Sequence, residues 1–200
     1  MKELKVKLTF TESILGTASA TPEIHAEFIA SNAPNAPSRE EEVAALGPEE
    51  VFEKGMTVFP KDADGVPFLW DYQIKGFFKD ACGMLRKVKD TESGKVKAYK
   101  KEIDGLIFVK ERKIPIHSDE QITICQRPLR ASTAQGERIA LSSSEEIQAG
   151  AFIEFTIQCL VDSQVDLVKE WLDYGALRGI GQWRNASHGR FTWEEVTNHG

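Results

Sequence analysis

Residues 151–161 have the sequence Ala-Phe-Ile-Glu-Phe-Thr-Ile-Gln-Cys-Leu-Val, and residues 162–174 continue it with a second, different pattern. Apolar and polar residues alternate in the first stretch, and this period of two predicts a half-buried strand. In residues 164–174 the apolar positions recur at helical spacing, namely Val165, Val168, Trp171 and Leu172. Asp162 or Ser163 is expected to cap this helix. The pair therefore predicts a strand followed directly by a helix.

The same two patterns extend toward both ends of the chain. Residues 4–10 alternate as a strand, and residues 71–88 have helical spacing with Asp71 as the expected N-cap. Further strands are predicted at residues 106–109, 112–116, 122–129, 138–142 and 190–196. This order predicts an α+β protein with a ferredoxin-like (RRM-like) βαββαβ core and extra β-hairpins. Both helices would cover one face of the sheet and leave the other face free for a ligand.

A chain of 200 residues suits a single domain spanning residues 1–200. Residues 16–54 interrupt it with a stretch rich in alanine, serine, threonine, asparagine and proline. We expect an inserted loop with a short strand at residues 24–30 and a short helix at residues 39–46. Because this stretch has few large apolar residues, it is interpreted as an insertion in the domain.

The composition, 41% hydrophobic and 28% charged, is that of a soluble globular protein. Cys82 and Cys159 fall on apolar faces and are interpreted as core residues. The three cysteines, Cys82, Cys125 and Cys159, form no CxxC pair, so a metal site is not predicted, and no cofactor is predicted either. No apolar run approaches the ~20 residues of a membrane helix, and no signal-peptide core is present. A cytoplasmic location is expected.

The net charge of −6 argues against a generic nucleic-acid binder. The charges are uneven, however: acids gather in residues 40–53, and bases gather in residues 75–113 and 178–190. Because charges more than about 8 Å apart are largely screened at physiological salt, a local basic groove is compatible with an acidic total.

The strongest functional feature is residues 175–191, Gly-Ala-Leu-Arg-Gly-Ile-Gly-Gln-Trp-Arg-Asn-Ala-Ser-His-Gly-Arg-Phe. Glycines expose backbone N–H groups to phosphates, arginines clamp phosphate oxygens, and an indole stacks on a base for about 1–3 kcal/mol. The residues with these roles are Gly179, Gly181, Gly189, Arg178, Arg184, Arg190 and Trp183. The alternative is a helix-to-strand connection whose glycines only turn the chain.

A second candidate contact is Lys75, which lies one turn into the helix of residues 71–88, beside Gly76. Its ammonium group could reach a phosphate near the positive end of the helix. The alternative is a solvated lysine. Arg127 and Arg130, on the strand at residues 122–129 and just after it, are expected to extend the track.

Three stretches together resemble the RAMP superfamily, and within it the backbone subunits of type III CRISPR effector complexes. Residues 64–80 resemble the family's turn, Ile-Pro-Gly-Ser-Ser-Leu-Lys-Gly segment and helix; residues 148–157 resemble its later strand; and residues 179–191 resemble its glycine-rich loop. The resemblance covers the chain outside residues 16–54. It implies a ferredoxin-like core that grips guide RNA along the sheet and the glycine-rich loop, in repeated subunits or with other CRISPR subunits. The implied contacts are Lys75, Gly76, Gly179, Gly181, Gly189 and Arg190.

The sequence departs from the family where Trp70-Asp71-Tyr72 replaces Pro-Gly-Ser. The loop at residues 55–60, where the family has its RNA-cutting aspartate, has no carboxylate. We therefore expect a non-catalytic protein that binds single-stranded RNA, or single-stranded DNA.

Two alternatives stay open. One is a metal-free endoribonuclease that processes CRISPR RNA, with His25 or His188 as the proton-transfer group. The other is an interaction protein, stand-alone or encoded by a phage, that mimics nucleic acid or docks on a CRISPR complex through its acidic surface.

Overall fold

In the computed structural model, which describes residues 1–19, 56–133 and 136–197, the chain divides into two units. The first consists of Met1–Ile14, Pro60–Gln121 and Ile147–Gly200, and the second of Leu15–Phe59 and Ile122–Glu146. The strand expected at residues 24–30 and the helix expected at residues 39–46 lie outside the described residues.

The first unit contains a four-stranded antiparallel sheet in the order β11-β1-β10-β6. Its strands are β1 (Lys2–Phe10), β6 (Ile107–Val109), β10 (Phe152–Cys159) and β11 (Phe191–Glu195). Along β1 the side chains alternate between buried and half-buried, as the period-two pattern predicted. A separate two-stranded ladder joins β5 (Phe68–Trp70) to β7 (Lys113–Pro115).

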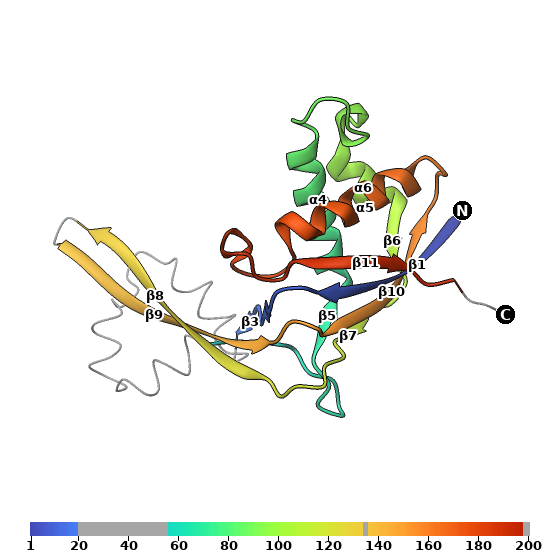
Figure 1. Cartoon of the computed structure of the whole chain (residues 1–200). Coiled ribbons are helices and arrows are strands. Elements are labelled where there is room, and N and C mark those ends of the chain that lie inside the picture. Colours follow the sequence, from blue (N-terminus) through green and yellow to red (C-terminus); the bar gives the residue numbers. More distant parts are fainter. Residues whose placement is uncertain (20–55, 134–135, 198–200) are drawn as a thin grey trace, which may run out of the picture. The chain divides into compact units, whose positions relative to one another are not determined.

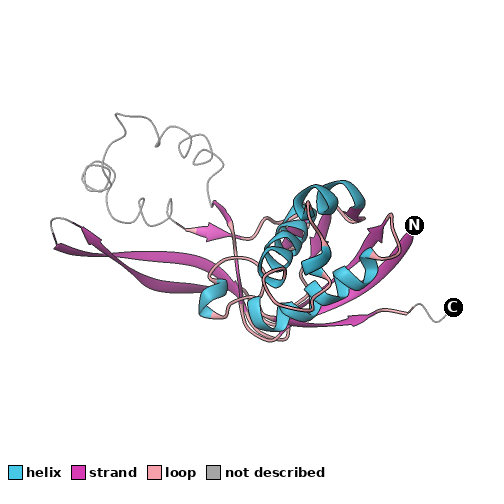
Figure 2. Ribbon diagram, turned by 90° about the horizontal axis from the view of Figure 1, so that it is seen from above, coloured by secondary structure: helices cyan, strands magenta, loops and turns pink. Residues whose placement is uncertain are grey.

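Three helices cover one side of this sheet (Figure 1 and Figure 2): α4 (Asp71–Leu85), α5 (Tyr99–Leu106) and α6 (Gln164–Arg178). Large aromatic side chains join the helices to one another and to the sheet. The ring of Phe78 on α4 lies 5.4 Å from that of Trp171 on α6, and the ring of Phe77 lies 5.3 Å from that of Phe191 on β11. These contacts pack α4 against both α6 and β11.

The 3-10 turn η1 (Ser93–Lys95) is anchored to α6 by the carboxylate of Glu170. That carboxylate accepts hydrogen bonds from the backbone N–H groups of Glu92, at 2.8 Å, and Ser93, at 3.0 Å, and also from the Ser93 hydroxyl group. The indole of Trp171 donates to the same hydroxyl oxygen at 2.9 Å. Ser93 is fully buried, so its polar atoms depend on these partners.

Replacing Glu170 with alanine is expected to lower the free energy of unfolding by about 1–3 kcal/mol, because it leaves buried donors without an acceptor. Urea denaturation of the purified protein measures this loss. Glu195→Ala is the control, since among the described residues the surface carboxylate that it removes pairs with Lys169 alone, and such pairs contribute about 0–1 kcal/mol. An equal effect of the two substitutions would contradict an anchoring role for Glu170.

The second unit contains the hairpin of β8 (Thr123–Thr133) and β9 (Gly136–Ile147). β4 (Thr57–Val58) pairs in parallel with β9, and β3 (Ala18–Ser19) pairs antiparallel with β4. β2 (Ile14–Leu15) lies along β9 in the same sheet.

The prediction of an α+β protein is confirmed. The strands expected at residues 122–129 and 138–142 are longer than predicted and form the hairpin β8–β9. Helix α5 and strand β5 were not predicted. Cys82 and Cys159 are both fully buried, which confirms their assignment to the core, and burial raises the pKa of Cys159 to about 11.

The helix expected over residues 71–88 differs from α4 at both ends. Its N-cap is Trp70, whose backbone N–H donates to Oε1 of Gln73 at 2.7 Å, whereas the carboxylate of Asp71 pairs with Arg112 at 2.5 Å. The helix ends at Leu85, so Val88 lies beyond it and is 55% exposed.

None of the helices in residues 1–19, 56–133 and 136–197 has the length and apolar character needed to cross a membrane.

Candidate nucleic-acid interface

The loop between α6 and β11 is closed at its base by backbone hydrogen bonds. Ile180 N–H donates to the carbonyl of Gly189 at 2.9 Å, and Gly189 N–H donates to the carbonyl of Ser13 at 2.8 Å. Gly179 ends helix α6 with φ of 75°. The two ends of the loop are therefore held together at Ile180 and Gly189, and Ile180 is buried at the base of the loop.

Two of the three glycines in this loop, and Gly175 in the last turn of α6, are required by packing. A Cβ atom on Gly189 would lie 1.9 Å from the carbonyl oxygen of Ile180, and one on Gly179 would lie 2.6 Å from that of His188. A Cβ on Gly175 would lie 2.1 Å from the ring of Phe191. The remaining loop glycine, Gly181, is half-buried and lines the pocket that the loop forms. Of the glycines predicted to contact phosphate, Gly181 is therefore the one found at this pocket.

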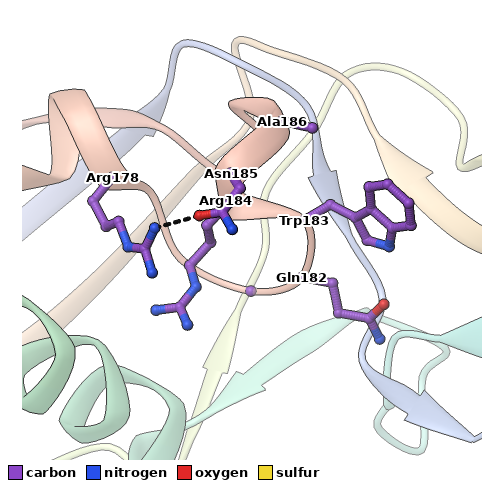
Figure 3. A pocket seen from close by; sticks show the side chains of 7 residues that line it. Arg178, Gln182, Trp183, Arg184, Asn185 and Ala186 are labelled. Carbon is purple, nitrogen blue, oxygen red and sulfur yellow. Dashed lines mark hydrogen bonds between the residues drawn. The ribbon is translucent and has the colours of Figure 1, made fainter.

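The loop forms an open pocket of about 650 Å³ (Figure 3). This volume is in the range of small-molecule and cofactor sites, about 300–1,000 Å³. Its lining residues all come from the end of α6 and the loop, and they are Arg178, Gly181, Gln182, Trp183, Arg184, Asn185 and Ala186. The structure therefore gathers four of the predicted site residues, Arg178, Gly181, Trp183 and Arg184, at one place.

The two arginines of this pocket share one carboxylate. Nε of Arg178 and Nη1 of Arg184 both donate to Oδ2 of Asp80 on α4, each at 2.8 Å. Arg178 also donates to Oδ1 of Asn185 at 2.6 Å. The hydrogen bond to Asp80 raises the pKa of Arg178. Two guanidinium groups facing one carboxylate leave one positive charge uncompensated, and the side chains are 25% and 30% exposed.

Trp183 occupies the other side of the loop from the two guanidinium groups (Figure 3). It is half-buried and has φ of 54°, in the left-handed region that non-glycine residues avoid at a cost of roughly 1–2 kcal/mol. This conformation directly precedes the 3-10 turn η2 (Arg184–Ala186). The backbone thereby directs the indole and the neighbouring Arg184 side chain to opposite sides.

Lys75, Gly76 and Arg190 do not line this pocket. Lys75 donates to the backbone carbonyl of Asp104 at 3.1 Å and lies over the ring of Phe108 at 4.9 Å, and its side chain is 17% exposed. Gly76 is exposed on α4. Nε of Arg190 is buried, and no hydrogen-bond acceptor for it is found within the described ranges.

Arg127 and Arg130 belong to strand β8 of the second unit. Nη2 of Arg127 donates to the hydroxyl oxygen of Ser144 on β9 at 3.0 Å, and burial lowers the pKa of this guanidinium. Arg130 pairs with Ile139 in the hairpin register, and its side chain lies outside the described part of the structure.

The open face of the four-stranded sheet carries balanced charges. Lys5 lies 3.9 Å from a carboxylate oxygen of Glu154, and Lys7 lies 3.8 Å from one of Glu194. Glu3 accepts a hydrogen bond from Gln158 at 2.8 Å. Because Lys5 and Lys7 have carboxylate neighbours, they give this face little net positive charge for a polyanion.

His188 lies at the base of the loop with its Nδ1 atom 3.0 Å from the Ser13 hydroxyl oxygen. It does not line the loop pocket. The other histidine considered for proton transfer, His25, falls outside the described residues.

Four residues of the site were not predicted from the sequence: Asp80, Gln182, Asn185 and Ala186. Gln182 and Asn185 are next to Trp183 and Arg184, so their places in the loop could have indicated them. Asp80 has no such signal, since in the sequence it is one polar position on the flank of an amphipathic helix.

The fold is similar to that of subunits of CRISPR effector complexes, as the sequence motifs predicted. One match is a chain of the type III-B Cmr-beta complex bound to cognate target RNA, with 12% identity and a TM-score of 0.53 over 98% of this chain. A second is a chain of a type IV-B CRISPR complex, with 11% identity and a TM-score of 0.52 over 100% of this chain and 92% of that one.

The protein spans only 60% of the length of the type III-B chain. No protein-family model matches its sequence, and no curated protein sequence is significantly similar to it. The likeness is therefore one of fold.

Proposed function

We propose that this protein is a non-catalytic, single-stranded nucleic-acid-binding RAMP-like subunit of a CRISPR-type complex, with RNA as its ligand. The observation that carries this proposal is the pair of arginines on one carboxylate in the loop pocket. Their uncompensated charge suits a phosphate, and Trp183 in the same pocket suits an unpaired base. The fold similarity to a chain from an RNA-bound complex agrees with it.

The proposal includes a ferredoxin-like core in a single domain, with residues 16–54 as an insertion. Its support is the strand order β11-β1-β10-β6, with α4 between β1 and β6 in the chain and α6 between β10 and β11. That order follows from two βαβ halves whose helices cover the same face. Lys75, Gly76, Arg127, Arg130 and Arg190 remain predicted contacts outside the pocket. A nucleic acid that contacts these residues as well would have to extend beyond the pocket.

A charge series at the pocket tests the proposal. Arg184→Ala leaves one arginine facing Asp80, and its affinity for single-stranded RNA is expected to fall about tenfold, the loss of one charged hydrogen bond of about 1.4 kcal/mol. Asp80→Asn removes the opposing charge but keeps a side-chain oxygen that can accept hydrogen bonds from the arginines. Affinity is expected to rise about fivefold, because unit charges about 4 Å apart in water interact by about 1 kcal/mol. Fluorescence anisotropy at fixed salt measures both.

A purely structural role for the arginine pair gives a different pattern, because both substitutions would then lower stability without opposite effects on affinity. Equal affinities of the two variants and the unmodified protein would reject the pocket as the binding site. Thermal unfolding of each variant, followed by circular dichroism, identifies any loss caused by unfolding alone.

The second candidate function is metal-free cleavage of CRISPR RNA, which the hydrogen-bonding distance between His188 and Ser13 favours. Labelled RNA incubated with and without chelator separates the two candidates. Chelator-resistant cutting that His188→Ala or His25→Ala abolishes would make the protein an endoribonuclease, and intact RNA at saturating protein would exclude it.

A further inference from the structure

The segment that follows α4 is strongly basic, although the protein as a whole is acidic. Residues 84–101 contain seven lysine and arginine residues and two acidic ones, a net charge of +5 in a chain of net charge −6. All seven basic residues are exposed. One of the two acids, Glu92, pairs with Lys95. We call this surface the basic patch. Such a concentration of like charge raises the local concentration of anions.

A second pocket, of about 440 Å³, lies at this patch. Lys79, Arg86, Lys87 and Tyr99 line it, together with Asp80. The guanidinium carbon of Arg86 lies 5.3 Å from the centre of the Tyr99 ring. Tyr99 also packs against Gly83 of α4, and a Cβ atom on Gly83 would lie 3.2 Å from the hydroxyl oxygen of Tyr99. Cations combined with a positioned aromatic ring are the components of a single-strand binding groove.

The two pockets meet at one residue. Asp80 lines the second pocket, and its Oδ2 atom holds Arg178 and Arg184 of the loop pocket. A chain of phosphates leaving the two arginines at Asp80 would therefore come next to Arg86 and Lys87. Lys79 is already paired with Asp104 at 2.6 Å, so those two exposed cations are the principal phosphate partners there.

We infer that the basic patch is a second subsite for the phosphate backbone of a single-stranded nucleic acid, continuous with the loop pocket and with Tyr99 as its stacking surface. This inference rests on the proposed function, since one strand would occupy both pockets. The charge density and the aromatic ring together favour a nucleic acid over an acidic protein segment, which would use the cations but not the ring.

The test compares two lengths of oligouridylate, about 6 and about 20 nucleotides, chosen to fill one pocket or both. The triple variant Lys97→Gln, Lys100→Gln, Lys101→Gln and the double variant Arg86→Gln, Lys87→Gln neutralise exposed side chains of the patch. The matched control is Lys2→Gln, Lys61→Gln, Lys110→Gln, which makes the same change in net charge at exposed lysines outside the patch.

The long oligonucleotide is expected to lose about tenfold in affinity in the triple variant, and the slope of log K against log salt to fall by about 2, at about 0.7 per phosphate contact. The short oligonucleotide should bind the triple variant and the unmodified protein equally. The control variant should lose less than about threefold, the residual effect of net charge at screened distances.

Two results would overturn the inference in distinguishable ways. If Arg184→Ala weakens the short oligonucleotide but neither patch variant weakens the long one, the loop pocket binds nucleic acid and the patch does not, and an acidic protein partner becomes the candidate for it. If neither oligonucleotide binds the unmodified protein, the proposed function itself fails, and the second subsite fails with it.

Discussion

Replacing Gly189 with alanine is expected to lower the free energy of unfolding by about 3 kcal/mol or more, the combined cost of overpacking and a strained backbone. The new Cβ would lie 1.9 Å from the carbonyl oxygen of Ile180, which is main chain and cannot rotate away. Gly189 also has φ of 71°, which alanine disfavours. Because the backbone of Gly189 forms hydrogen bonds with both Ile180 and Ser13, the base of the loop in the variant should open before the rest of the unit unfolds.

Urea denaturation and amide hydrogen exchange measure the two parts of this expectation. The control is Gly76→Ala on the exposed side of α4, where no described atom other than its chain neighbours and the nearby helix backbone lies within 4 Å of the new Cβ. This substitution should stabilise the protein by about 0.4–1 kcal/mol, since it restricts the unfolded chain. A Gly189→Ala variant as stable as Gly76→Ala would show that the loop base can rearrange freely.

Replacing Trp183 with alanine is expected to reduce affinity for single-stranded RNA by about 1–3 kcal/mol, which is the range measured for stacking of one base on an aromatic side chain. The dependence on salt should stay the same, because no charge is removed. Trp183→Phe keeps a ring at the same position and should retain most of the affinity. Anisotropy titrations at several salt concentrations measure both quantities.

Charge-removing and ring-removing substitutions thus have different signatures at the same pocket. Arg184→Ala should flatten the salt dependence, whereas Trp183→Ala should only shift the affinity. If Trp183→Ala and Trp183→Phe weaken binding equally, the indole contributes through its own contacts within the loop rather than by stacking on a base. Circular dichroism of the two variants checks that the loop change leaves the fold intact.

The sequence predicted the architecture wherever a short repeat of apolar residues determined it. The alternation in β1 and β10 and the helical spacing in α4 and α6 required only neighbouring residues, and all four elements are present. The helix predicted over residues 164–174 is too short, because α6 continues to Arg178. In the structure Gly175 is inside the helix, and its missing side chain makes room for the ring of Phe191.

The candidate site was only partly predictable, since its charge balance depends on residues far apart in the chain. Arg178 and Arg184 are 98 and 104 positions from Asp80, and no local pattern reports such a pairing. Lys75 is likewise held by Asp104, which lies 29 positions further on, in a helix that was not predicted. Sequence proximity therefore identified Arg178, Gly181, Trp183 and Arg184 of the loop pocket, but not the carboxylate that the two arginines face.

The shared carboxylate of Asp80 also has an entropic consequence. A free arginine side chain loses about 2 kcal/mol of rotamer entropy when it is fixed. Arg178 and Arg184 are already fixed by hydrogen bonds to Asp80, so this loss is taken up in folding rather than at the moment a ligand arrives. An incoming phosphate would meet two guanidinium planes in place. An acidic protein can in this way present a rigid, positively charged binding site without raising its overall charge.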